Sequence, residues 1–162
     1  MGETAKDSRQ APIWGLFLIP TFAVLTAALP YFFNIEIGPA RAHVSAVSLL
    51  FNLALFYLLK IRTGASVRQS IIFFALNGVL TIIAFAGIYR SLGIIEQGFF
   101  RYPTHTDAAY FSIVTFTTLG YGDFQPVAAY RLVAATEALI GYVYLGLLVG
   151  FLLQLRDEGK GG

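Results

Sequence analysis

Four long apolar stretches run through this chain of 162 residues and decide which solvent it can fold in. They cover residues 13–33, 44–59, 70–92 and 128–155. A helix needs about 20 apolar residues to cross a bilayer, so the second stretch is short, and an interfacial or re-entrant helix is its alternative. Only 12% of the residues are charged, against roughly 25% in an average soluble domain. We therefore expect an all-α membrane protein with four transmembrane helices.

The basic residues set the expected orientation of these helices. If the N-terminus lies in the cytoplasm, seven of the 11 lysines and arginines fall on the cytoplasmic side, as the positive-inside rule favours. Both termini are then cytoplasmic, the expected location is the cell membrane, and the longest link, residues 91–127, lies outside. The expected division is a cytoplasmic N-terminus (1–12), two helices with a basic cytoplasmic loop (13–69), a unit of two further helices (70–155) and a cytoplasmic tail (156–162).

Several classes of function find no support in the sequence. The chain has no cysteine, which excludes disulfides, thiolate metal sites and cysteine nucleophiles. Both histidines fall in expected external loops, and paired carboxylates and nucleophile motifs are missing, so a membrane enzyme is the weakest hypothesis. A net charge of +2 without a basic cluster gives no argument for nucleic acid. The first two stretches also lack the regularly spaced arginines that a voltage sensor needs.

The link between the last two apolar stretches contains a half-length helix of its own. Asp107 is the expected N-cap, and residues 108–117 would extend about 15 Å as a helix, which is half a membrane. This re-entrant helix ends where the segment Thr118-Leu119-Gly120-Tyr121-Gly122-Asp123 begins. Pro126 then prevents an immediate start of the next helix.

The segment after the half-length helix can present its carbonyl oxygens to one side. Gly120 and Gly122 accept positive φ angles that other residues avoid. An alternation of left- and right-handed residues would point successive carbonyl oxygens toward a common axis. These are the oxygens of Thr118, Leu119, Gly120 and Tyr121. One chain supplies one oxygen at each level, which cannot replace the hydration shell of an ion, whereas four chains supply a ring. A homotetramer is therefore part of the expected mechanism.

This segment resembles the signature of potassium channels, whose filter loops replace the hydration shell of K⁺ with carbonyl oxygens. The resemblance extends over residues 71–155 and includes Asp107–Ser112, Arg131–Ala134 and Gly141. It implies a potassium-selective channel subunit whose pore domain is 70–155, with an outer helix, a pore helix, a filter and an inner helix. K⁺ would bind at Thr118, Leu119, Gly120 and Tyr121, with Gly122 completing the filter and Asp123 at its mouth. The permeant ion is the only small partner implied, with no cofactor.

Two further features of the inner helix follow from the resemblance. Gly141 takes the place of the hinge glycine. The residues Leu145, Val149 and Leu153 recur at helical spacing on the same face as Gly141, and we expect them to form an apolar gate. The alternative is that this stripe packs on the helix at 70–92. Some bacterial relatives carry a glutamate that pairs with the filter aspartate where this chain has Val114, so Asp123 needs another partner. We expect Arg131 to anchor the outer end of the helix at 128–155, and a pairing of Arg131 with Asp123 is the alternative.

Glu137 is the one acidic residue well inside an expected span. An ionisable group at such a depth faces a partner or water. Because Glu137 lies one helical turn before Gly141, we expect it to support the pore helix from behind by hydrogen bonds to hydroxyl groups, the candidates being Tyr110, Ser112, Thr115 and Thr117. The alternative is a carboxylate that faces a water-filled cavity and concentrates cations. For the whole chain, the alternatives to a potassium channel subunit are a weakly selective cation channel and a non-conducting regulatory subunit.

Overall fold

The computed structural model describes residues 66–159 together with six isolated positions between 33 and 49. In chain order the elements are α3 (Val67–Leu92), β1 (Ile94–Glu96), β2 (Phe99–Arg101), α4 (His105–Phe116), β3 (Phe124–Pro126), the 3₁₀ helix η1 (Ala128–Tyr130) and α5 (Arg131–Glu158). Apart from Phe33, Ser45, Ala46 and Leu49, the expected helices at 13–33 and 44–59 lie outside the described residues. The described part is therefore the proposed two-helix unit with its connecting link.

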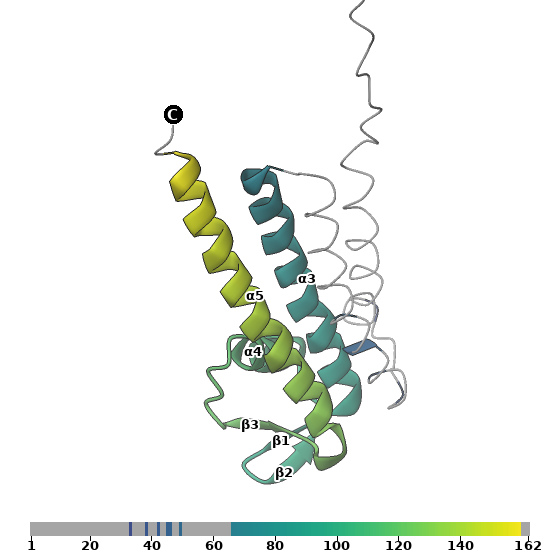
Figure 1. Cartoon of the computed structure of the whole chain (residues 1–162). Helices are drawn as coiled ribbons and strands as arrows, with labels where there is room; N and C mark the ends of the chain where they lie inside the picture. Colours follow the sequence, from purple (N-terminus) through teal and green to yellow (C-terminus); the bar gives the residue numbers. More distant parts are fainter. Residues whose placement is uncertain are drawn as a thin grey trace, which may run out of the picture.

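The two long helices α3 and α5 lie side by side, and the short helix α4 lies against both of them near one end (Figure 1). By length and composition, two described segments could cross a membrane, Ser70–Leu92 and Ala128–Asp157. Their positions match the third and fourth apolar stretches of the sequence. The helix α4 is too short to cross, at 12 residues or about 18 Å.

A small antiparallel sheet lies at the end of the helix pair where α4 packs. β1 is the central strand, in the order β2-β1-β3, and it pairs Ile95 with Phe100 on one side and with Gln125 on the other. The expectation of an all-α chain is therefore wrong in this detail. The physical reason is local, because Gln97 and Gly98 both have positive φ, as the tightest hairpin turns require, and β-branched and aromatic residues flank them.

The start of α4 differs from the sequence-based expectation by one turn. Thr104 is the N-cap, and its hydroxyl accepts a hydrogen bond from the backbone N–H of Asp107. Asp107 accepts in return from the backbone N–H of Thr104, at 3.3 Å, which completes a capping box. Asp107 is thus the third residue of the helix and not its N-cap. Both residues favour helix starts, and the capping box uses the two together.

One apolar core holds the three helices together. Its buried aromatic rings include Phe74 and Tyr89 from α3, Phe111 and Phe116 from α4, and Tyr144 and Phe151 from α5. Phe74 stacks on Tyr144 with ring centroids 4.1 Å apart and meets Phe151 edge-on at 5.4 Å. Three isolated described positions, Ala42, Ala46 and Leu49, are buried in the same cluster.

Candidate functional site

The segment expected to form the filter begins directly after Thr117, the C-cap of α4. The backbone N–H of Thr118 donates to the carbonyl of Thr115, and that of Leu119 donates to the carbonyl of Val114, both at 3.0 Å. These two bonds form a Schellman motif, in which the residue after the C-cap takes a left-handed conformation. Thr118 occupies that position, with a φ of 60°. The orientation of the first filter carbonyl is therefore set by the end of the helix.

Left-handed and ordinary residues alternate through the rest of the segment. Thr118, Gly120 and Gly122 have φ angles of 60°, 54° and 83°, whereas Leu119 and Tyr121 between them have no positive φ. No hydrogen bond of the described residues ends on the carbonyl oxygens of residues 118–121. The expected positive φ angles at Gly120 and Gly122 are present. Residue type does not predict the third positive φ angle, at Thr118, because a β-branched side chain makes this conformation costly.

The outer end of the segment is held by α4 and by the sheet. The Tyr110 hydroxyl donates to Oδ2 of Asp123 at 2.8 Å, and this contact raises the pKa of Tyr110. The Tyr110 ring meets the ring of Phe124 edge-on, with centroids 5.7 Å apart. Arg131, the candidate partner of Asp123, is not paired with it, since both ion pairs of the described residues belong to Arg101. Asp123 thus takes its described side-chain partner from the half-length helix.

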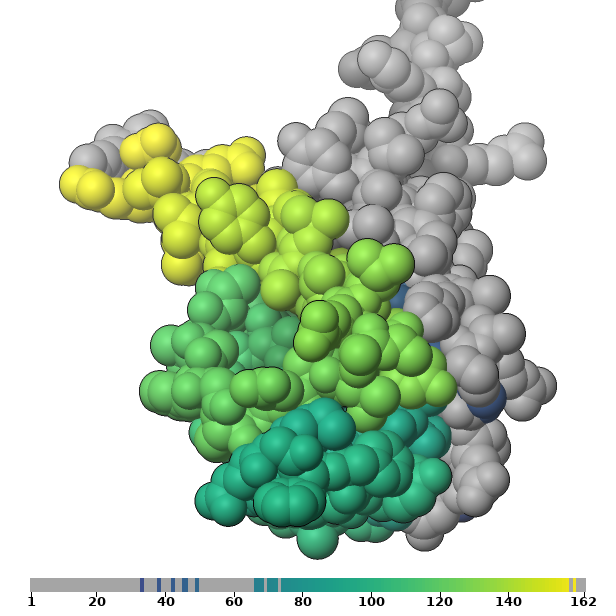
Figure 2. All heavy atoms as spheres, turned by 90° about the horizontal axis from the view of Figure 1, so that it is seen from below, coloured from purple at the N-terminus to yellow at the C-terminus, as the bar shows by residue number. Residues whose placement is uncertain are grey.

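Arg101 joins three elements around this outer end. Its guanidinium contacts the carboxylates of Glu96 on β1 and Asp107 on α4, and it lies 5.2 Å from the ring centroid of Phe124 on β3. The hydrogen bond from Thr104 and the pairing with Arg101 lower the pKa of Asp107 below its ordinary value. Seen from this end, the hairpin and the loop after α4 lie on the same face of the molecule (Figure 2). We call Arg101, Glu96, Asp107, Tyr110 and Asp123 the outer rim.

Behind the segment, α5 passes very close to the end of α4. A Cβ atom built on Gly141 would lie 1.8 Å from the carbonyl oxygen of Phe116 and 2.6 Å from its carbonyl carbon. Only a glycine allows this approach, because both atoms are backbone and cannot rotate away. Gly141 is buried inside an unbroken helix. The structure thus gives this glycine a packing role, whereas its role as a gating hinge stays a prediction.

One turn earlier on α5, the Glu137 side chain is fully buried, with 0% of its surface exposed. Its Oε1 lies 2.5 Å from Oγ of Ser112 on α4, and its Oε2 lies 2.5 Å from the hydroxyl oxygen of Tyr89 on α3. Ser112 Oγ also lies 2.8 Å from the carbonyl oxygen of Ile82 on α3. We call Glu137, Ser112 and Tyr89 the rear brace. The contact with Ser112 was among those expected from the sequence, whereas Tyr89 was not.

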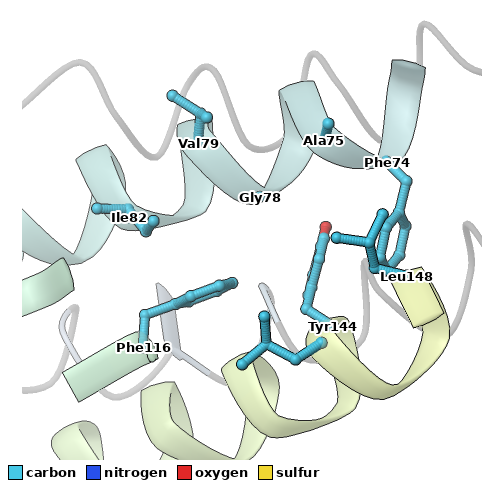
Figure 3. Close-up of a pocket in the computed structure, with 9 residues that line it drawn as sticks. Phe74, Ala75, Gly78, Val79, Ile82, Phe116, Tyr144 and Leu148 are labelled. Carbon is cyan, nitrogen blue, oxygen red and sulfur yellow. The ribbon is translucent and has the colours of Figure 1, made fainter. Parts of the chain in front are cut away.

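The residues of the expected gate are not buried against α3. Leu145, Val149 and Leu153 expose 41%, 56% and 55% of their surfaces in the single chain. Leu145 also borders a cavity of about 170 Å³ between α3, α5 and the end of α4, into which Phe116 and Tyr144 point (Figure 3). The stripe is therefore available to line a pore or to meet another chain, and its role as a gate stays a prediction.

Sequence reasoning missed those site residues whose partners come from other elements. Tyr89 lies 48 positions from Glu137 in the sequence, and no spacing rule connects them. Arg101 falls in the expected external link, and its place on β2 beside two carboxylates makes it the centre of the outer rim. The available signal was the apolar pattern around Gln97-Gly98, which marks a hairpin and would have placed Arg101 near Glu96.

Chemically, the site offers oxygen ligands rather than side-chain chemistry. Among the described residues there is no group of three or more histidines, cysteines or carboxylates that could hold a metal ion. Backbone carbonyl oxygens suit hard cations, which exchange water for such ligands. The arrangement can therefore offer backbone oxygens to a cation along the segment 118–121.

Comparison with known proteins points to the same chemistry. Residues 78–156 match the "Ion channel" family. The two-pore potassium channel 5 of Arabidopsis thaliana is 34% identical over 83 residues, which are 44% of this chain and 20% of the relative. The two pore potassium channel c of Oryza sativa subsp. japonica is 40% identical over 63 residues, 35% of this chain and 14% of the relative. No solved structure matches the chain significantly.

The family match covers the described site, since it extends from α3 through the segment 118–123 to the last turn of α5. The chain accounts for less than a quarter of the length of either plant relative. The apolar helices and the family agree in indicating a membrane protein that transports ions. Residues 78–156, just under half of this chain, match the ion channel family, and parts of the chain are similar to two potassium channels of plants.

Proposed function

We propose that this chain is the subunit of a homotetrameric channel that conducts K⁺ selectively and passively across a cell membrane. In this proposal α3 is the outer helix, α4 the re-entrant pore helix, residues 118–122 the selectivity filter and α5 the inner helix that lines the pore. The two stretches at 13–33 and 44–59 add two more transmembrane helices, and both termini lie in the cytoplasm.

The observation that carries the proposal is the alternation of left-handed residues at Thr118, Gly120 and Gly122. Reversing handedness at every second residue turns successive carbonyl groups to the same side of the chain, which a regular helix or strand does not do. The oxygens of residues 118–121 then form a row. K⁺ would bind between successive levels of this row, where carbonyl dipoles replace its hydration shell.

A single row of oxygens is not enough, and the surface of the single chain supports further copies. Leu119 and Tyr121 expose 59% and 68% of their surfaces, although they lie in the middle of the site. The side of α5 away from α3 is also apolar and exposed, including Leu132, Leu139, Val149 and Leu153. Four copies around an axis would complete each ring of oxygens and cover these surfaces.

The experiment that tests this proposal is flux through the purified chain in liposomes. With K⁺ and Na⁺ on opposite sides, a selective channel shifts the reversal potential toward the equilibrium potential of K⁺. With the two ions at equal concentrations, a reversal potential near zero means equal permeabilities and would favour a weakly selective cation channel. Absence of flux from correctly assembled protein would favour a regulatory subunit that needs a conducting partner.

The assembly is tested on the same preparation. In mild detergent the particle should have the mass of four chains of 17.7 kDa. A conducting particle of two chains would contradict the proposal, since each chain supplies one filter segment and two segments leave every ring half complete.

A further inference from the structure

The hydrogen-bonding groups around the carboxyl group of Glu137 can be matched to the protons they carry. Three contacts are involved: Tyr89 with Oε2, Ser112 with Oε1, and Ser112 with the carbonyl oxygen of Ile82, at 2.5, 2.5 and 2.8 Å. A hydroxyl group has one proton to donate, and a carbonyl oxygen has none. If Glu137 is ionised, three contacts share the two protons of Tyr89 and Ser112. One contact then brings two acceptors together.

A proton on Oε1 of Glu137 removes this conflict. Glu137 then donates to Ser112, Ser112 donates to the carbonyl oxygen of Ile82, and Tyr89 donates to Oε2. Each contact has one donor and one acceptor, as buried polar groups require. The neutral acid also avoids burying a charge, which is costly without a partner, and no basic side chain of residues 66–159 forms an ion pair with Glu137.

We infer that Glu137 is a permanent proton-binding site: a neutral carboxylic acid whose O–H donates to Ser112 and so fastens α4 to α3 and α5. This inference rests on the proposed function in one respect, because α4 is the helix from which the filter starts. Glu137, Ser112 and Tyr89 touch no ion in this arrangement and are positioning residues. They fix the rear of α4 six residues before Thr118, where the filter backbone begins.

The alternative is an ionised Glu137, and it has different consequences in a tetramer. Four carboxylates would surround the pore just behind the filters and raise the local concentration of cations. Single-channel conductance at low salt would then depend on the charge of residue 137. A neutral acid adds no such charge, so conductance should depend on the shape and hydrogen bonding of residue 137 alone.

Infrared spectroscopy of the purified, reconstituted full-length chain tests the proton directly. A carbonyl stretching band of a protonated acid that disappears when residue 137 is replaced by glutamine reports Glu137. We expect this band in the parent, with a shift in D₂O, and its loss in Glu137→Gln. Absence of the band in the parent, or its persistence in Glu137→Gln, would overturn the inference. Neither result depends on potassium selectivity, so this test can fail while the proposed function stands.

Rescue by a conservative variant tests the role of the proton as a donor. A glutamine supplies an N–H donor in place of the acid O–H and a carbonyl acceptor, with one further N–H, whereas alanine supplies neither donor nor acceptor. Glu137→Ala and Ser112→Ala should reduce steady-state K⁺ flux by roughly tenfold, since each leaves buried polar groups without partners. Glu137→Gln should restore most of the flux lost in Glu137→Ala. The reverse result, with glutamine as damaging as alanine, would show that the charge of an ionised Glu137 is what matters.

Two tyrosines provide the matched control. Tyr89→Phe removes a hydroxyl from the rear brace, whereas Tyr144→Phe removes a buried hydroxyl that hydrogen-bonds Thr81 elsewhere between the same helices. Faster loss of K⁺ current at low external K⁺ in Tyr89→Phe, but not in Tyr144→Phe, supports a brace that acts on the filter. Equal rates of current loss in the two variants would show that the Tyr89 hydroxyl has no special effect on the filter, and would overturn its assigned role.

Discussion

The filter segment is held from two sides, and the two sides use opposite physical means. The rear brace is buried and, by our assignment, uncharged: Glu137, Ser112 and Tyr89 connect three helices through hydroxyl and carboxyl groups. The outer rim is partly exposed and charged: Arg101 pairs with Glu96 and Asp107, and Tyr110 holds Asp123. Hydrogen bonds in a dry interior are costly to break, whereas exposed ion pairs contribute little and weaken in salt.

The two sides should therefore have different roles in holding the filter. The rear fixes where α4 lies, and it should be indifferent to the composition of the external solution. The rim faces that solution, so pH and ionic strength can reach it directly. Four predictions, in order of decreasing effect, test whether the two sides differ in this way.

The largest effect should come from closing the space behind the filter. Gly141→Ala places a methyl group where the backbone of Phe116 lies, so α4 and α5 must move apart. Overpacking of this kind costs about 3 kcal/mol or more per chain when backbone must shift. We expect loss of the assembled channel, measured by size-exclusion chromatography and thermal unfolding. Gly146→Ala is the control, because its Cβ meets no atom within 4 Å in the chain. A stable, conducting Gly141→Ala channel would show that the rear is not tightly packed.

The second effect concerns the filter itself, between the two sides. A methyl group on Gly120 meets no atom within 4 Å, but the residue has a φ of 54°. A left-handed residue with a side chain costs about 1–2 kcal/mol. Gly120→Ala should therefore assemble normally and lose preference for K⁺ over Na⁺ in reversal-potential measurements. Leu119→Ala is the control, because it changes a side chain in the same segment at a position without positive φ. Selectivity that survives in Gly120→Ala would contradict the assigned backbone.

A third, smaller effect is expected at the outer rim. Tyr110→Phe removes the hydroxyl that donates to Asp123 and keeps the ring that packs on Phe124. The bond is exposed to water, which can replace it in part, so we expect K⁺ current to decay a few-fold faster with assembly unchanged. The matched comparison is Tyr89→Phe at the rear. A larger effect on assembly from Tyr110→Phe than from Tyr89→Phe would reverse the contrast between the two sides.

The smallest effect should be the pH dependence of the rim. The pKa of Asp107 is lowered in the folded chain, so its pairing stabilises the fold above the ordinary aspartate pKa. This contribution disappears as the pH falls through the lowered value. Asp107→Asn keeps the acceptor for the Thr104 N–H and removes the charge. The difference in melting temperature between parent and variant should shrink as the pH is lowered from neutral to about 3, and high salt should reduce it at neutral pH. A difference in melting temperature that changes with neither pH nor salt would mean that the charge of Asp107 contributes nothing to stability.

The sequence predicted those features that depend on local pattern. The two long helices follow from apolar stretches of the right length, and the half-length helix follows from helix-favouring residues before a glycine-rich segment. The positive φ angles at Gly120 and Gly122 follow from the residue type, because glycine adopts them without strain. Helical geometry alone limited the candidate partners of Glu137 to a few hydroxyl groups, and Ser112 is one of them.

What the sequence did not predict depends on tertiary contacts or on competition between equivalent signals. Three-residue strands are too short for a clear alternation, so the hairpin at 94–101 was missed. Thr104 and Asp107 are both good caps, and local sequence cannot say which one starts the helix. The left-handed Thr118 arises because α4 ends in a Schellman motif that continues into the filter, and residue type alone argues against it.

The pairing of β3 with β1 imposes a rule on the length of the chain beyond the filter. Phe124 lies opposite Glu96, and its ring lies between Arg101 and Tyr110. Successive residues of a strand point to opposite faces, so a shift of one residue turns every side chain over. One inserted residue between Asp123 and Phe124 would move Phe124 to the place of Gln125 and Gln125 to that of Pro126, so the two side chains would exchange faces. Two inserted residues would restore each side chain to its original face. Changes in length at the exit of the filter should therefore be tolerated in even numbers and not in odd ones.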